Sequence, residues 1–153
     1  LLEHAPSLCA LTNPTTNSYK RLIAGYEAPT YTDYAIGSRA AAIRIPEYVR
    51  NLNEQRIEYR IPDCMANPYL ALSAIILAGL DGIEKKIVHP GKKSLPTNLL
   101  DALTEFKHDH KFLLTNNVFT EEIIDQWIEI KKSEFETVNQ HPTVQEFILY
   151  YGV

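Results

Sequence analysis

The sequence of 153 residues has few cysteines, which limits the kinds of fold it can adopt. Its only two, Cys9 and Cys64, have no partner at the spacing of a metal-binding motif. We expect both to be reduced and to behave as small, mostly buried side chains. A disulfide-rich scaffold and a structural zinc domain are thereby excluded. The fold must depend on an apolar core, which a chain of this length can form.

Long hydrophobic runs are also missing. The longest, from Leu70 to Leu80, is interrupted by Ser73 and falls short of the roughly 20 apolar residues that a membrane helix needs. The first residues, Leu-Leu-Glu-His-Ala-Pro, lack the basic segment and apolar core of a secretory signal. We therefore expect no membrane partner and a cytoplasmic location.

The chain has little net charge, with a formal value of -4. Residues 20–60 nevertheless carry seven Lys and Arg against five Asp and Glu, whereas residues 101–153 carry four against ten. Aromatic side chains do not alternate with the arginines, as they would on a surface that stacks nucleic-acid bases. We expect no nucleic-acid partner, and we expect the basic residues of the first half to have a different use.

The two halves also differ in hydrophobic pattern. The first half has short alternating segments, and the second has Leu, Ile, Glu and Lys at helical spacing. This order predicts an α+β fold, with a partial antiparallel sheet followed by a C-terminal helical region. Strands are predicted from Arg39 to Pro46 and from Arg56 to Ile61, and we expect them to form an antiparallel pair.

Three helices are predicted in the second half. Asn67 before Pro68 is typical of a helix start, and that helix is expected to run to about Lys86. A second is expected to begin near Thr97 and a third after Thr120. Apolar spacing predicts the buried faces of the last two helices. These are Leu99, Leu100, Leu103 and Phe106 on the second, and Ile123, Ile124, Trp127, Ile128, Phe135 and Val138 on the third.

The second predicted strand alternates charged and apolar residues. Period-two geometry places Arg56, Glu58 and Arg60 on one face, and a facing register adds Arg44 from the preceding strand. One interpretation is a solvated sheet face with ion pairs that each contribute about 0–1 kcal/mol. The other is an anion site, because clustered guanidinium groups bind carboxylates and phosphates. In that case Glu58 is paired or coordinates a hard divalent ion such as Mg²⁺.

A longer motif begins at Asn13 and reads Asn-Pro-Thr-Thr-Asn-Ser-Tyr-Lys-Arg-Leu. Together with Gly-Tyr-Glu-Ala-Pro from Gly25, it resembles the type I glutamine synthetase family, and the similarity extends over essentially the whole chain. The resemblance implies that residues 1–153 are the C-terminal part of a catalytic domain. Residues 1–66 would form the sheet and active-site loops, and residues 67–153 would be mainly helical. The family's N-terminal β-grasp domain has no counterpart here.

The resemblance also implies an activity, which is the ATP-dependent ligation of ammonia to L-glutamate through γ-glutamyl phosphate. The substrates would be L-glutamate, ATP and ammonium, with two or three Mg²⁺ or Mn²⁺ ions per site. The full-length enzyme would be a homo-oligomer, a dodecamer, in which the C-terminal segment around Tyr150 docks into a neighbouring subunit. The fragment alone is expected to be inactive.

Residue roles follow from the same resemblance. Glu27 is expected to close over the intermediate and to help take a proton from ammonium, and Arg39 to stabilise the transferred phosphoryl group. Glu58 is expected to be a ligand of the divalent ion. The remaining assignments are glutamate binding by Arg21, Glu27, Arg39 and Arg60, and ATP binding by Arg39, Arg44 and Arg56.

Two alternatives remain open within this resemblance. Relatives of the family couple glutamate to amines or polyamines, and the sequence does not exclude that nucleophile. A non-catalytic glutamine-synthetase-like protein is the other alternative. The joint presence of the charged residues named above argues against it, because a scaffold does not need them in combination.

Overall fold

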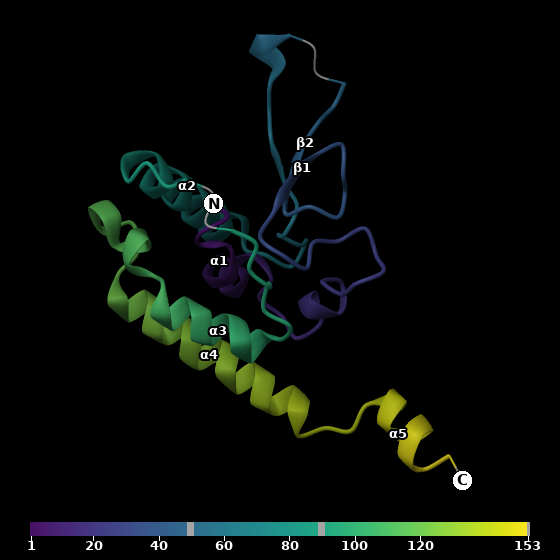
Figure 1. Cartoon of the computed structure of the whole chain (residues 1–153). Helices are drawn as coiled ribbons and strands as arrows, with labels where there is room; N and C mark the ends of the chain where they lie inside the picture. Colours follow the sequence, from purple (N-terminus) through teal and green to yellow (C-terminus); the bar gives the residue numbers. More distant parts are fainter. Residues whose placement is uncertain (49–50, 89–90, 153) are drawn as a thin grey trace.

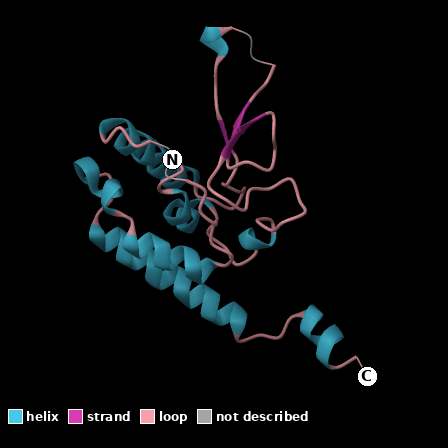
Figure 2. Ribbon diagram, in the orientation of Figure 1, coloured by secondary structure: helices cyan, strands magenta, loops and turns pink. Residues whose placement is uncertain are grey.

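Helices and a small sheet lie side by side in the protein, which confirms the predicted α+β class (Figure 1 and Figure 2). The computed structural model describes residues 1–48, 51–88 and 91–152. Within these ranges every helix is too short or too polar to cross a membrane. The four longest helices form one body, and the sheet lies beside it with a long loop that projects away (Figure 2).

Helix α1, Ala5–Thr12, lies at the centre of the helical body (Figure 1). All its residues are buried, and it packs against α2, Pro68–Glu84, and α3, Leu99–His108. No helix was predicted here, because a helix that is buried on all sides has no polar face and therefore no helical period. Pro6 fits in its first turn, where the missing N–H costs no hydrogen bond.

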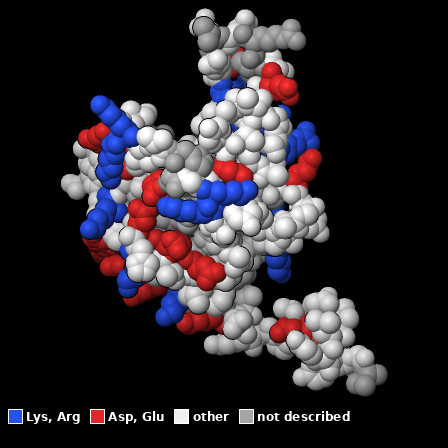
Figure 3. Space-filling view, in the orientation of Figure 1, with Lys and Arg blue, Asp and Glu red and all other residues white. Residues whose placement is uncertain are grey.

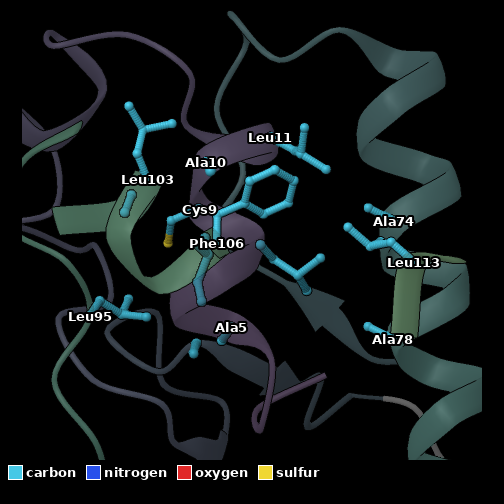
Figure 4. Close-up of a cluster of buried hydrophobic side chains, with 14 of the residues drawn as sticks. Ala5, Cys9, Ala10, Leu11, Ala74, Ala78, Leu95, Leu103, Phe106 and Leu113 are labelled. Carbon is cyan, nitrogen blue, oxygen red and sulfur yellow. The ribbon is translucent and has the colours of Figure 1, made fainter. Parts of the chain in front are cut away.

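The apolar core fills the space between α1 and its neighbours (Figure 4). Phe106 of α3 is 1% exposed and is the largest of the fully buried side chains. Ala42 and Ile61, both fully buried, continue the core to the edge of the sheet. Cys9 is buried in this core as predicted. Cys64 is exposed, contrary to expectation, because it lies on the loop between the last strand and α2.

The sheet brings the predicted strands together in antiparallel fashion. Its order is β1-β2-β3, where β1 is Tyr34–Ile36, β2 is Ile43–Ile45 and β3 is Glu58–Tyr59. Arg44 of β2 lies opposite Glu58 of β3, which is the facing register that the alternation predicted. Between β2 and β3 the chain forms the projecting loop, which contains the short 3-10 helix η2, Leu52–Glu54 (Figure 1).

Two features of the sheet differ from the prediction. Both strands are shorter than predicted, because only residues 43–45 and 58–59 have pairing partners. In addition, β1 pairs with β2 in parallel, so the sheet is mixed rather than purely antiparallel. Parallel neighbours usually need a crossover of a dozen or more residues, and only residues 37–42 separate these two strands. A connection this short gave no reason to expect that β1 pairs with β2 in parallel.

The helix starts follow the predicted caps closely. Asn67 accepts hydrogen bonds from the backbone N–H groups of Tyr69 and Leu70 and so caps the start of α2. This helix ends at Glu84, two residues before the predicted Lys86. Asn98, next to the predicted Thr97, caps α3. The Thr120 side chain accepts from the N–H of Ile123 and begins α4, Glu121–Asn139. Between α3 and α4 lies the 3-10 helix η3, Lys111–Asn117.

The buried faces of α3 and α4 are narrower than predicted. On α4, Ile124 is 1% exposed, whereas Ile123 and Val138 are 43% and 49% exposed. Leu100 on α3 is 40% exposed for the same reason, since neighbouring residues on a helix point about 100° apart. The other predicted α4 residues, Trp127, Ile128 and Phe135, are partly buried against the core.

Helix α5, Val144–Tyr150, lies away from the rest of the chain (Figure 1). Thr143 and Glu146 form a capping box, in which each side chain accepts a hydrogen bond from the backbone of the other. None of its residues is buried, although Phe147 and Tyr150 are large and apolar or aromatic. Among the described residues, local capping and not burial against the rest of the chain therefore holds α5.

A buried histidine links three helical segments at the start of α1. His4 is 5% exposed; its Nδ1 lies 2.7 Å from Oδ2 of Asp109, which follows α3, and its Nε2 lies 3.0 Å from Oδ2 of Asp81 in α2. Its ring also stacks on Phe112 of η3. Burial alone would lower the pKa of His4, but the hydrogen bonds to Asp109 and Asp81 raise it above 6.5. We call His4, Asp81 and Asp109 the His4 clamp.

Candidate active site

Three charged side chains meet where β2 and β3 pair. Nη1 of Arg44 donates to Oε2 of Glu58 at 2.8 Å, and Nη1 of Arg60 donates to Oε1 of the same carboxylate. Arg44 and Arg60 are mostly buried, with side chains 19% and 18% exposed, whereas Glu58 is 41% exposed. We call Arg44, Glu58 and Arg60 the triad. They are three of the four residues that the alternation pattern and the facing register placed on one face of the sheet.

The triad carries more positive than negative charge. Hydrogen bonds from Arg44 and Arg60 hold the pKa of Glu58 below its ordinary value of 4.5, so this carboxylate is charged at neutral pH. Two guanidinium groups against one carboxylate leave an excess of positive charge. Because Nε of Arg44 also donates to the carbonyl of Gly37, that guanidinium is fixed in place. A fixed cationic surface of this kind suits a phosphate or a carboxylate.

A second, exposed ion pair adjoins the triad. Nη1 of Arg39 donates to Oε2 of Glu27 at 3.1 Å, and the two side chains are 59% and 73% exposed. Arg60 connects this pair to the triad, because its Nε donates to the Arg39 carbonyl and its Nη2 to the Glu27 carbonyl. An exposed pair contributes only about 0–1 kcal/mol, so Arg39 and Glu27 can exchange each other for another partner at little cost.

Arg21 lies behind the backbone that follows β3. Its guanidinium donates to the carbonyls of Arg60, Ile61 and Pro62. Its Nε is buried and has no hydrogen-bond partner among the described residues. Arg21 is therefore next to Arg60, but it contacts the backbone at that position.

Arg56 lies apart from the triad. Its Nη2 donates to the hydroxyl of Tyr48 at 2.8 Å, its guanidinium lies over the Tyr48 ring, and its Nη1 donates to the Glu54 carbonyl. The predicted alternation does not reach this residue, because β3 begins only at Glu58. Arg56 instead lines an open hollow of about 510 Å³ beside β2, together with Ile45, Pro46, Gln55 and Ile57.

Glu58 is not part of a complete metal site in this chain. Within residues 1–48, 51–88 and 91–152, no group of three or more His, Cys, Asp or Glu side chains could hold a metal ion. Each oxygen of Glu58 already accepts from an arginine, although a carboxylate has further lone pairs. Without such a group, the described residues do not by themselves fit the two or three ions that the resemblance implies.

Sequence reasoning missed two residues of this region. Tyr48 gave no signal, because its contact with Arg56 depends on the fold of the projecting loop. Asn13 is fully buried, and its Nδ2 donates to the carbonyl of Ile61 at 2.8 Å. A sequence pattern does not distinguish a buried asparagine from one on the surface. In the sequence, Asn13 stands out only as the first residue of the motif.

The fold and the site together define a class of protein, namely an α+β domain with a cluster of arginines on a small mixed sheet. Acidic and basic side chains are interspersed on the face seen in Figure 3, which differs from the continuous basic surface of a nucleic-acid-binding protein. Residues 1–150 match the family model described as "Glutamine synthetase, catalytic domain". The chain belongs to this family.

Relatives in this family are similar over the whole chain. It is 44% identical to a glutamine synthetase of Aquifex aeolicus and 46% identical to one of Mycobacterium bovis, each over 170 aligned positions. These alignments include 100% of this chain but 36% of each relative, so the chain spans about a third of their length. A cryo-EM structure of Plasmodium falciparum glutamine synthetase superposes with a TM-score of 0.90 at 31% identity, over 98% of this chain and 40% of that one.

Proposed function

We propose that these residues form part of the active site of a glutamate–ammonia ligase, which makes glutamine from L-glutamate, ATP and ammonium. The observation that carries this proposal is the continuous set of contacts centred on Arg60. Arg60 reaches Glu58 of the triad and the carbonyls of Glu27 and Arg39. A ligase of this kind must hold a carboxylate substrate next to a phosphoryl donor, and these contacts join groups suited to both.

The glutamate end of the site consists of Arg21, Glu27, Arg39 and Arg60 in this proposal. Arg60 and Arg39 have the positive charge to bind a carboxylate, and the exposed Arg39–Glu27 pair can open to admit it. Once released, Glu27 would cover the intermediate and accept a proton from ammonium. Arg39 would then face the charge that develops on the transferred phosphoryl group.

The ATP end consists of Arg39, Arg44 and Arg56. Arg44 is fixed by Gly37 and Glu58, so it can present charge to a phosphate without rearrangement. Arg56 lines the hollow beside β2, which has room for part of a nucleotide. Glu58 would contribute one oxygen ligand to a Mg²⁺ or Mn²⁺ ion, which supplies charge neutralisation for phosphates when bound.

The complete site needs more residues than this chain provides. The absence of a metal-binding group in the described residues and the coverage of 36% of the relatives support the proposal that these residues work within a longer polypeptide. In it they would be the C-terminal part of the catalytic domain, with residues 1–66 at the site. The exposed apolar α5 supports docking on another subunit of a homo-oligomer. ATP as a substrate favours a cytoplasmic location.

The proposal predicts different activities for two forms of the protein. A longer chain that contains these residues should form glutamine from glutamate, ATP and ammonium, whereas the 153 residues alone should form none. The measurement is glutamine released per site, with omission of ATP as the control. An inactive longer chain would contradict the proposed function, and an active 153-residue chain would contradict the incomplete site.

A further inference from the structure

The backbone that leaves β3 is held from behind by the segment that follows α1. The N–H of Asp63 donates to the carbonyl of Thr12 at 3.0 Å. Nδ2 of Asn13 donates to the carbonyl of Ile61 at 2.8 Å, and Arg21 shares that same carbonyl. Asn13 and Ile61 are both fully buried, so no water replaces these bonds if they are lost.

The orientation of the Asn13 amide is determined by its neighbours. Oγ1 of Thr12 lies 2.8 Å from Oδ1 of Asn13 and 3.0 Å from the carbonyl of Leu8. Only the orientation with the amide oxygen towards Thr12 gives the Ile61 carbonyl a donor from Asn13. Thr12 and Asn13 therefore act as a pair in which the Asn13 amide nitrogen donates to the carbonyl of Ile61, the residue next to Arg60.

We propose that Asn13 is a positioning residue for Arg60, a role that rests on the proposed function of Arg60 in glutamate binding. The N–H of Arg60 is fixed by the Ala42 carbonyl at 2.9 Å, and Asn13 fixes the carbonyl of the next residue, Ile61. The backbone is thus held on both sides of Arg60. Its side chain can then reach Glu58, Glu27 and Arg39 at once.

Arg21 does not make Asn13 redundant. It divides its donors over three carbonyls, and the bonds to Arg60 and Pro62 are long, at 3.2 to 3.3 Å. If Arg21 turns to a substrate carboxylate, it gives up part of this hold on the backbone. Asn13 has no such second use, because it is completely enclosed. It keeps Ile61 in place while Arg21 changes partner.

The test uses the longer enzyme that contains these residues. Asn13→Leu keeps the volume but removes the donor, and Thr12→Val leaves the amide without its orienting hydroxyl. Trp127→Phe is the matched control. It removes a part-buried hydrogen bond of similar length, from Nε1 of Trp127 to the carbonyl of Ala10 at 3.0 Å, and both of these residues are distant from Arg60 in the sequence. Circular dichroism reports whether each variant is folded.

The expected result is a selective loss of glutamate affinity. Loss of the bond should raise the KM for glutamate about 10-fold in Asn13→Leu, and about 3-fold in Thr12→Val, with the KM for ATP unchanged. Trp127→Phe should leave both KM values unchanged. An unchanged KM for glutamate in either folded variant overturns the proposal, as does an equal rise in the control. If the wild-type enzyme makes no glutamine, the proposed function itself fails, which is a distinct outcome.

Discussion

Replacing Glu58 by glutamine in the longer enzyme is expected to lower kcat for glutamine formation by about 100- to 1,000-fold. The neutral amide removes the charge that Arg44 and Arg60 share, and it presents an N–H group where one of them now donates. In the proposed site, the change would also take a carboxylate oxygen away from the divalent ion. The measurement is kcat at saturating glutamate, ATP and ammonium.

Glu129→Gln is the matched control for this change. Glu129 is an exposed glutamate on α4, outside the site, and its replacement should leave kcat within about twofold, as surface substitutions usually do. A folded Glu58→Gln enzyme with the kcat of the wild type would show that the triad is a structural ion-pair network. The solvated-face interpretation of the strand would then be the correct one.

Replacing His4 by glutamine is expected to destabilise the 153-residue chain by about 2 kcal/mol on the acidic side of neutrality. His4⁺ bridges the carboxylates of Asp81 and Asp109, while a glutamine has no charge at any pH. Lys85 remains paired with Asp81 at 2.6 Å, which limits the loss. The measurement is the free energy of unfolding by urea at a series of pH values.

The pH dependence of this difference has a definite sign. The pKa of His4 is higher in the folded chain than its ordinary value of 6.5, so its contribution is fully present below 6.5 and is lost as the pH rises through the raised pKa. The lower limit is the pKa of Asp81, where burial is outweighed by hydrogen bonds from Lys85 and His4 that lower it from 3.8. The amino group of Leu1 also interacts with Asp81, but it titrates in both proteins.

His108→Gln is the control for the His4 clamp, since His108 is exposed at the end of α3. It should leave the free energy of unfolding unchanged at every pH. A difference between wild type and His4→Gln that grows with rising pH would contradict a charged His4. The clamp would then consist of neutral hydrogen bonds.

The parts of the fold that sequence predicted are those with a local cause. Asn67 and Thr120 begin helices because their side chains accept from the first backbone N–H groups, and this depends on only three or four residues. The pairing of Arg44 with Glu58 was predicted for a similar reason, since alternation fixes which side chains share a face of a strand. Arg60 donates to the same carboxylate of Glu58, as its place on this face predicts.

The parts that sequence did not predict depend on distant residues. Helix α1 is recognisable only once α2 and α3 surround it, because burial on all sides removes the helical period. Arg56 fits the alternation pattern in the sequence but lies outside β3, and its guanidinium donates to the hydroxyl of Tyr48. Asn13 contacts a carbonyl 48 residues away, a distance that no local pattern reports.

The proposed ligation of ammonia to glutamate is best tested by following the nitrogen atom from ammonium into the product. The longer enzyme is supplied with glutamate, ATP and ¹⁵N-labelled ammonium together with unlabelled methylamine and putrescine, and the products are analysed by NMR and mass spectrometry. If ammonium is the nucleophile, the label appears in the side-chain amide of glutamine, and only when ATP is present. Products carrying only methylamine or putrescine on the γ-carbonyl, or no ligation at all, would contradict it.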